Sequence, residues 1–155
     1  MREIRRKDRS IDRDTAEKLL TEAEYGVLAS CGKDSMPYAV PLNYVYSNGF
    51  IYFHCALSGH KLDNIEDNPQ VSFCVTGATN LRPSAFSTEY ISAVAFGTAA
   101  VIEGAEKIDA LKALVGKYSP AHIDAGDDYI AKKHKATAVV KITLSSLSGK
   151  QSVAK

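Results

Sequence analysis

Short apolar segments follow one another through most of this 155-residue chain, with too few residues between them for helical crossovers. The first three of these segments lie within residues 27–55 and are separated only by turn residues. Asn48-Gly49, between the second and the third, accepts the positive φ angles of a type I′ turn, which is a strong hairpin signal. Parallel strands need connections of a dozen or more residues. The chain is therefore predicted to form an antiparallel sheet.

Six strands and four helices are expected in all. Apolar residues at helical spacing predict helices over 14–24, 59–67, 105–117 and 127–135. Because strands and helices follow in blocks, we expect a mainly β fold in which helices cover the openings of an antiparallel barrel. Six strands are few for a closed sheet, so some edges are expected to pair with a second chain. The strands are expected at 27–31, 38–46, 50–55, 71–76, 90–102 and 136–144, with Gly97 marking a bulge or a close backbone approach.

Composition and charge indicate one globular domain over residues 1–155. The content of 45% hydrophobic and 24% charged residues is ordinary for a soluble protein. Lys and Arg total 19 against 18 Asp and Glu, which argues against nucleic-acid binding through bulk charge. No apolar run approaches the roughly eighteen residues of a membrane span. Residues 1–13 form a short basic arm, which we expect to be solvated or to lie across a partner subunit.

The cysteines and the first residues favour a cytoplasmic protein. Cys31, Cys55 and Cys74 are isolated in the sequence, so neither a metal knuckle nor a disulfide framework is predicted. The four histidines also lack metal-ligand spacing, and residues 1–10 contain no hydrophobic run typical of a signal peptide. We therefore expect a reducing compartment and no bound metal.

The segment from Phe53 to Leu62, where a strand ends and a helix begins, is the most informative for chemistry. His60 and Lys61 lie in the first turn of that helix, although cations there oppose the helix dipole. A bound anion would reverse the sign of this interaction. Helix N–H groups, the Ser58 hydroxyl and the two cations can together hold a phosphate. The alternative is a solvated basic face beside an ordinary capping serine.

Three other segments are candidates for ligand binding. His54, at a strand end, can face a substrate or a cofactor ring, or be simply a half-buried polar residue. Pro41 removes a ladder donor from an apolar strand, which is typical of a sheet edge, where backbone groups are free for a planar heterocycle. Hydroxyls are dense over 86–92, where they can bond a ribityl chain or a phosphate, or only form turns. No dinucleotide-binding, P-loop or nucleophile-elbow motif occurs.

Together these segments resemble the FMN-binding split-barrel family, the superfamily of pyridoxamine 5′-phosphate oxidase, and within it the nitroimidazole-resistance (Nim-like) proteins. The resemblance covers almost the whole chain and depends on the order and spacing of several motifs. The matching segments are 5–9, 37–44, 51–56, 59–64, 68–69, 86–92, 96–97 and 148–150.

The resemblance implies a six-stranded antiparallel split barrel that forms a homodimer, with two FMN sites at the subunit interface. It places the flavin phosphate at His60 and Lys61, and His54 beside the flavin and the substrate. Two departures argue against vitamin B6 oxidation: the oxidases have Arg-Lys where this chain has His60-Lys61, and their C-terminal Arg-Leu-x-Pro type motif is missing at 147–151. The cofactor-binding residues that it implies are Val40, Pro41, Leu42, Asn43, His54, Ala56, Gly59, His60, Lys61, Ser87, Thr88 and Ser92.

The leading hypothesis is an FMN-dependent oxidoreductase that reduces small acceptors such as nitroaromatics or quinones. In this hypothesis His54 orients the acceptor or supplies a proton. One alternative is a flavin-binding protein of the same fold without useful turnover. Another is a haem-binding or haem-degrading split barrel, with a histidine as the axial ligand. A dimer with an inactive site would leave the cations at the helix start unexplained.

Overall fold

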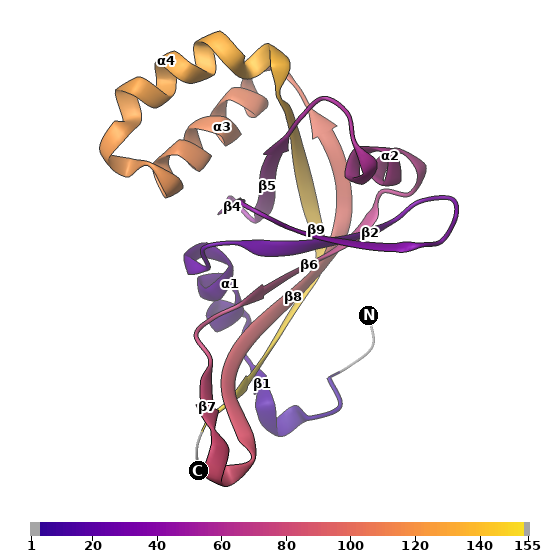
Figure 1. Cartoon of the computed structure of the whole chain (residues 1–155), viewed down its shortest axis with the longest axis vertical. Coiled ribbons are helices and arrows are strands. Elements are labelled where there is room, and N and C mark those ends of the chain that lie inside the picture. The colour runs from indigo at the N-terminus through magenta and orange to yellow at the C-terminus, as the bar shows by residue number, and fades with distance from the viewer. Residues whose placement is uncertain (1–3, 154–155) are drawn as a thin grey trace.

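A computed structural model describes residues 4–153 as an antiparallel sheet that curls into a half-barrel with four helices around it (Figure 1). This confirms the mainly β, split-barrel prediction, although the described residues form nine strand segments rather than six: β1 and β7 were not predicted, and the strand predicted over 38–46 is divided in two. The strands are β1 (Ser10–Ile11), β2 (Gly26–Cys31), β3 (Pro37–Leu42), β4 (Val45–Ser47), β5 (Phe50–Cys55), β6 (Gln70–Thr76), β7 (Asn80–Arg82), β8 (Ser87–Ile102) and β9 (Ala138–Ser152).

The sheet follows the order β3-β2-β6-β8-β9-β5-β4, with β1 added on β9 and β7 on β8. The long strands β8 and β9 pair with each other and run along the long axis of the molecule (Figure 1). Their register shifts between Phe96 and Gly97, which confirms the expected bulge. A Cβ at Gly97 would lie 2.3 Å from the Thr143 carbonyl oxygen, so only glycine allows the two backbones to approach this closely.

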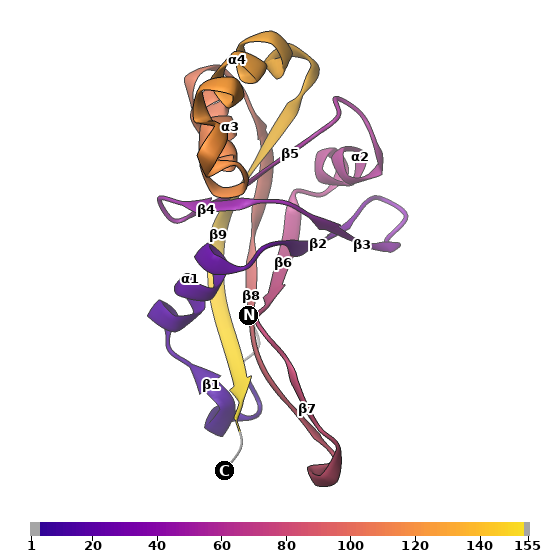
Figure 2. The ribbon, with the colours of Figure 1, turned by 60° about the vertical axis from the view of Figure 1, so that its left-hand side comes forward.

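The four predicted helices are α1 (Arg13–Glu22), α2 (His60–Asp67), α3 (Gly104–Tyr118) and α4 (Ile123–Lys133). The last begins four residues before its predicted start, because a 3₁₀ turn at Pro120–His122 leads directly into it. Helices α3 and α4 form a hairpin at one end of the molecule, α2 lies on the other side of β5, and the β7–β8 hairpin projects from the opposite end (Figures 1 and 2). Within the described residues, no helix is long and apolar enough to span a membrane.

Strand β5 separates two apolar clusters. Ile51 and Phe53 are fully buried inside the barrel, where Leu20 of α1 closes the core. Tyr52 points the other way and packs with Leu114 of α3 in a second cluster. Successive side chains of a strand face opposite sides. His54, two residues after Tyr52, therefore faces the same side as Tyr52, toward α3.

The predicted strand over 38–46 is wrong in one respect, because it breaks between β3 and β4. Tyr44 is fully buried at the break, and its backbone N–H donates to the Tyr118 hydroxyl over 2.9 Å. The same hydroxyl lies 2.9 Å from the Tyr44 carbonyl oxygen. A side chain thus replaces the missing ladder partner, which lets the chain turn here. The hairpin predicted at Asn48-Gly49 is confirmed, with φ values of 53° and 83°.

The basic arm is tied to its own chain in the structure. Residues 1–3 of the arm lie outside the described residues. Beyond them, Ser10 and Ile11 pair with the end of β9 at Lys150 and Gly149. Arg6 and Asp8 form an ion pair that lowers the pKa of the Asp8 carboxyl to about 2. The role of the arm across a partner subunit stays a prediction.

Candidate functional site

The start of α2 is an open, positively charged turn. Strand β5 ends at Cys55, a four-residue loop follows, and the helix begins at His60. Gly59 has a φ of +141°, a conformation that favours glycine, and a Cβ added there would meet nothing within 4 Å. The first N–H groups of a helix have no acceptor within the helix. Hence backbone N–H donors and the basic residues His60 and Lys61 are brought together in one turn.

The charges at the two ends of α2 are compensated differently. At its C-terminal end, Asp67 is held by the Lys33 ammonium over 2.6 Å, and this partner lowers the pKa of Asp67. In the first turn, Asp63 lies beside the basic residues His60 and Lys61. The His60 ring packs on Tyr38 of β3, with 4.2 Å between the ring centroids. Contact with Tyr38 therefore holds the His60 side chain at the helix start.

A buried hydrogen bond fixes α2 on the barrel. Asn64 is only 4% exposed, and its amide donates to the Ser30 hydroxyl of β2 over 3.2 Å. Gly32, just beyond β2, approaches so closely that a Cβ there would lie 2.7 Å from the Asn64 side-chain oxygen. The direction of the helix start is consequently set by the barrel and not by solvent-exposed contacts.

This donor set suits a phosphate group. It offers backbone N–H groups, the Ser58 hydroxyl in the preceding loop, and the side chains of His60 and Lys61. The residues present therefore fit the phosphate end of FMN.

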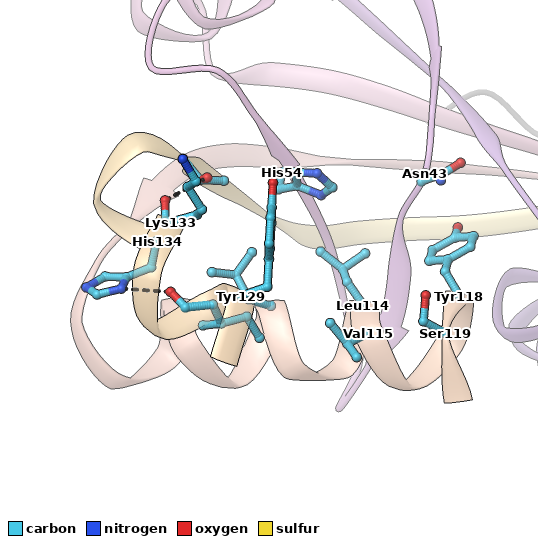
Figure 3. A pocket seen from close by; sticks show the side chains of 12 residues that line it. Asn43, His54, Leu114, Val115, Tyr118, Ser119, Tyr129, Lys133 and His134 are labelled. Atoms are coloured by element: carbon cyan, nitrogen blue, oxygen red, sulfur yellow. Dashed lines mark hydrogen bonds between the residues drawn. The ribbon is translucent and has the colours of Figure 1, made fainter. Parts of the chain in front are cut away.

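On the other side of β5, a cavity of about 240 Å³ lies beneath α3 and α4. His54 lies in its wall together with Asn43 from the break between β3 and β4 (Figure 3). The structure thus brings together two of the predicted site residues, one from β5 and one from the break between β3 and β4. The remaining lining residues come from α3, α4 and the segments that follow them: Leu111, Leu114, Val115, Tyr118, Ser119, Tyr129, Ile130, Lys133, His134 and Thr137.

The His54 ring is partly open to solvent through this cavity. Its partial burial disfavours the imidazolium form and lowers the pKa of His54 from its ordinary value of 6.5. The imidazole is therefore neutral at pH 7, so that one ring nitrogen can donate a hydrogen bond and the other can accept one.

Asn43 is positioned by a cluster of aromatic and basic side chains at the end of α3. The Tyr118 hydroxyl bonds the backbone of Tyr44 and also the carbonyl of Glu24 over 2.8 Å. Lys117 donates to the Ala23 carbonyl over 2.8 Å, and its ammonium lies 4.0 Å from the centre of the Tyr44 ring. The cluster joins the ends of α1 and α3 to the strand break.

The other predicted residues of the ring site lie along β3 and in the loop. Strand β3 ends the sheet, as the proline predicted. Val40 and Leu42 pack against the barrel core, whereas Pro41 is exposed. The backbone groups on the outer edge of β3 are thus available to meet a ligand. Ala56 is exposed in the loop before α2.

The hydroxyl-rich segment is far from these groups within one chain. Ser87 pairs with Arg82 and Thr88 with Leu81 in the hairpin that projects away from α2 (Figure 2). Ser92 lies further along β8, opposite Thr76. A single chain therefore does not bring these residues to His60 and Lys61.

Sequence reasoning missed three residues around the candidate site. Tyr38 and Tyr118 carried no pattern beyond that of an apolar strand and a helix end, and Tyr129 falls within a predicted helix. Their roles come from contacts between segments up to 74 residues apart, so no local signal could have identified them.

The sequence matches the family model described as pyridoxamine 5′-phosphate oxidase over residues 12–151. The chain belongs to this family. None of the curated proteins matches it in sequence.

Solved structures with a similar fold include three proteins from different bacteria. A candidate 5-nitroimidazole antibiotic resistance protein from Bacteroides thetaiotaomicron is 23% identical, with a TM-score of 0.75 over 92% of this chain and 86% of the other. The flavocytochrome Anf3 from Azotobacter vinelandii is 20% identical, with a TM-score of 0.84 over 98% and 73%. The FAD and heme binding protein from Mycobacterium smegmatis is 21% identical, with a TM-score of 0.81 over 92% and 72%. At such identities the likeness concerns the fold alone.

Proposed function

We propose that this protein binds FMN, with the flavin phosphate at the start of α2. The observation that carries the proposal is the basic pair His60 and Lys61 beside Asp63 in the first turn, while Asp67 at the other end is paired with Lys33. Without an anion, the Lys61 charge would oppose the helix dipole by a few tenths to about 1 kcal/mol. Family membership and the flavins named for similar folds support the same proposal.

The ring system would lie along the exposed backbone near Leu42 and Asn43. Strand β3 is an edge, so its outer N–H and C=O groups are available for hydrogen bonds to the rim of a heterocycle. Fixing of the Tyr44 backbone by Tyr118 would hold this edge in place when the ring binds.

A homodimer would complete the site. The hydroxyls of Ser87 and Thr88 are too far from α2 in one chain to contact the same ligand, but the hairpin of a second copy could supply them. Leu81 and Phe86, in the same hairpin, are 74% and 98% exposed, which is the kind of surface that a subunit contact covers.

We further propose an oxidoreductase activity toward small acceptors such as nitroaromatics or quinones. A bound flavin supplies the electron-transfer chemistry. The protein would contribute the position of the ring, a cavity beside it, and the neutral imidazole of His54, which can orient an acceptor or donate a proton to it.

The first experiment is the absorbance spectrum of the purified protein with and without added FMN. A yellow, FMN-type spectrum that follows the protein through gel filtration is expected. A protein that stays colourless after incubation with FMN would overturn the proposal. Steady-state turnover with a reduced nicotinamide nucleotide and a panel of nitro compounds and quinones then distinguishes an enzyme from a flavin-binding protein without activity.

Haem is the second candidate ligand, because a neutral imidazole in a cavity can serve as an axial ligand. Two proteins of similar fold are also named as a flavocytochrome and as a heme binding protein. A Soret band on addition of haemin that is lost in His54→Ala would support this function. Its absence in the unmodified protein would exclude it.

A further inference from the structure

The cavity beneath α3 and α4 has the size and the walls of a small-molecule site. Its volume of about 240 Å³ is slightly below the roughly 300–1,000 Å³ that is usual for drug-sized ligands. Buried aliphatic side chains form its base: Leu111, Leu114 and Ile130 are each less than 9% exposed. Such a space suits a compact, apolar body of about one ring.

The lining carries one positive charge and no negative charge. Its twelve residues include Lys133 and the imidazoles of His54 and His134, but neither Asp nor Glu. Two acids on these helices are paired with lysines: Asp127 lies 3.5 Å from the Lys112 ammonium, and Glu106 binds Lys141 over 2.7 Å. Within the lining itself, a cationic ligand would meet no counter-charge, whereas an anion would meet a lysine.

Several polar groups of the lining are already engaged. The Tyr118 hydroxyl holds the strand break, and the Nδ1 atom of His134 contacts the Ile130 carbonyl over 3.0 Å. In Figure 3, the Tyr129 side chain rises from α4 and presents its hydroxyl on the side of His54. His54, Tyr129 and Lys133 are the groups best placed to meet a ligand.

We propose that this cavity binds a compact planar aromatic compound that is neutral or anionic, with its polar substituent directed to His54, Tyr129 and Lys133. Binding of the ring requires only the cavity. The further statement that this compound is the electron acceptor rests on the proposed flavin function.

The test compares two probes of similar size and opposite charge, 4-nitrobenzoate and 4-nitrobenzylammonium, by isothermal titration. The full chain is used as purified and again with FMN added. The anion is expected to bind at least tenfold more tightly than the cation in both preparations. Equal affinities, or tighter binding of the cation, would overturn the proposal.

Lys133→Glu and Lys132→Glu form a matched pair for the charge. Both lysines are exposed in the last turn of α4, but only Lys133 lines the cavity. Lys133→Glu should weaken 4-nitrobenzoate binding by about three- to tenfold, as expected for a charge reversal several ångströms from the ligand in a polar medium. Lys132→Glu should change it less than twofold. A similar effect of both variants would show that only the overall charge matters.

A third variant fills the space. Ser119 is exposed at the rim, and Ser119→Trp should reduce binding of both probes at least tenfold while the thermal unfolding midpoint is retained. Unchanged probe binding in this variant would place the probe elsewhere. FMN affinity is measured on the same samples, so loss of flavin binding with probe binding intact contradicts only the proposed function, and the converse contradicts only the cavity.

Discussion

Two regions next to the end of β5 differ in their environment: the start of α2 and the cavity under α3 and α4. On one side the strand leads into the first turn of α2, where His60 is exposed and Lys61 is half-buried. On the other side His54 enters a cavity with aliphatic walls under α3 and α4. One region suits a phosphate and the other suits a ring.

The difference arises from the alternation of side chains along a single strand. Phe53 anchors β5 in the barrel core, so His54 must face α3, and the chain must then turn at Gly59 to begin α2. Two chemistries are thus placed within a few residues of each other without any long-range motif. Substitutions that act on both regions, on one of them, or on the contacts around them test this difference.

The largest effect is expected for Phe53→Ala, which removes the anchor common to both regions. Phe53 is fully buried, so the loss of burial and the resulting cavity should lower the free energy of unfolding by about 3–5 kcal/mol. Urea unfolding measures this value. Phe86→Ala is the control, because Phe86 is 98% exposed and should change the stability of the subunit by less than about 0.5 kcal/mol. Similar losses in both variants would contradict the burial argument.

Lys61→Ala should separate the two regions. Removal of one charged hydrogen-bond donor is expected to weaken FMN binding by about 1.5–3 kcal/mol. Binding of 4-nitrobenzoate in the cavity should be unchanged, since Lys61 is not among its lining residues. Both affinities are measured by titration on the same sample. If the two fall together, the regions are one site; if FMN affinity is unchanged, the phosphate lies elsewhere.

Tyr118→Phe tests the hydrogen bonds that hold the break between β3 and β4 beside the cavity. The change leaves the buried Tyr44 N–H without its acceptor, which should cost about 1–3 kcal/mol of stability. Hydrogen exchange of the Tyr44 amide should accelerate together with this loss. Tyr129→Phe, which deletes a hydroxyl from an exposed side chain, should leave both quantities unchanged. Equal behaviour of the two variants would exclude a positioning role for Tyr118.

The smallest effect concerns pH. The pKa of His54 is lowered in the folded state, so unfolding below about pH 6.5 takes up a proton at this residue. Its contribution to stability is therefore present above pH 6.5 and is lost as the pH falls toward the folded-state value. In His54→Gln, the decline of the free energy of unfolding between pH 7 and pH 5 should be less steep than in the unmodified protein. An equal decline would show that the pKa of His54 is the same in both states, and a steeper one would show that it is raised in the folded state; either would contradict the lowered pKa.

Much of the fold could be predicted because its determinants are local. The Asn48-Gly49 turn, the four helices and the bulge at Gly97 each follow from neighbouring residues. The break at Tyr44 could not, because it depends on a hydroxyl 74 residues away. Short β1, β4 and β7 were missed or merged for a similar reason, since pairing with a long neighbour and not their own composition defines them.

The candidate site could likewise be predicted only where its residues are close together in the sequence. Sequence spacing identified His54, His60 and Lys61, which belong to one continuous segment. It could not show that His54 and Lys61 serve different sides of the strand, or that Tyr38 packs on His60. The Ser87 and Thr88 hydroxyls were assigned to the same site, and within one chain they lie at the opposite end of the molecule.

The ratio of FMN affinity to riboflavin affinity tests the central claim most directly, because the two ligands differ only in the phosphate. We expect FMN to bind at least tenfold more tightly than riboflavin to the unmodified protein, which corresponds to about 1.4 kcal/mol or more from the phosphate. The ratio should fall several-fold in Lys61→Ala, with riboflavin affinity unchanged. Equal affinities for FMN and riboflavin in the unmodified protein would contradict a phosphate site at the start of α2.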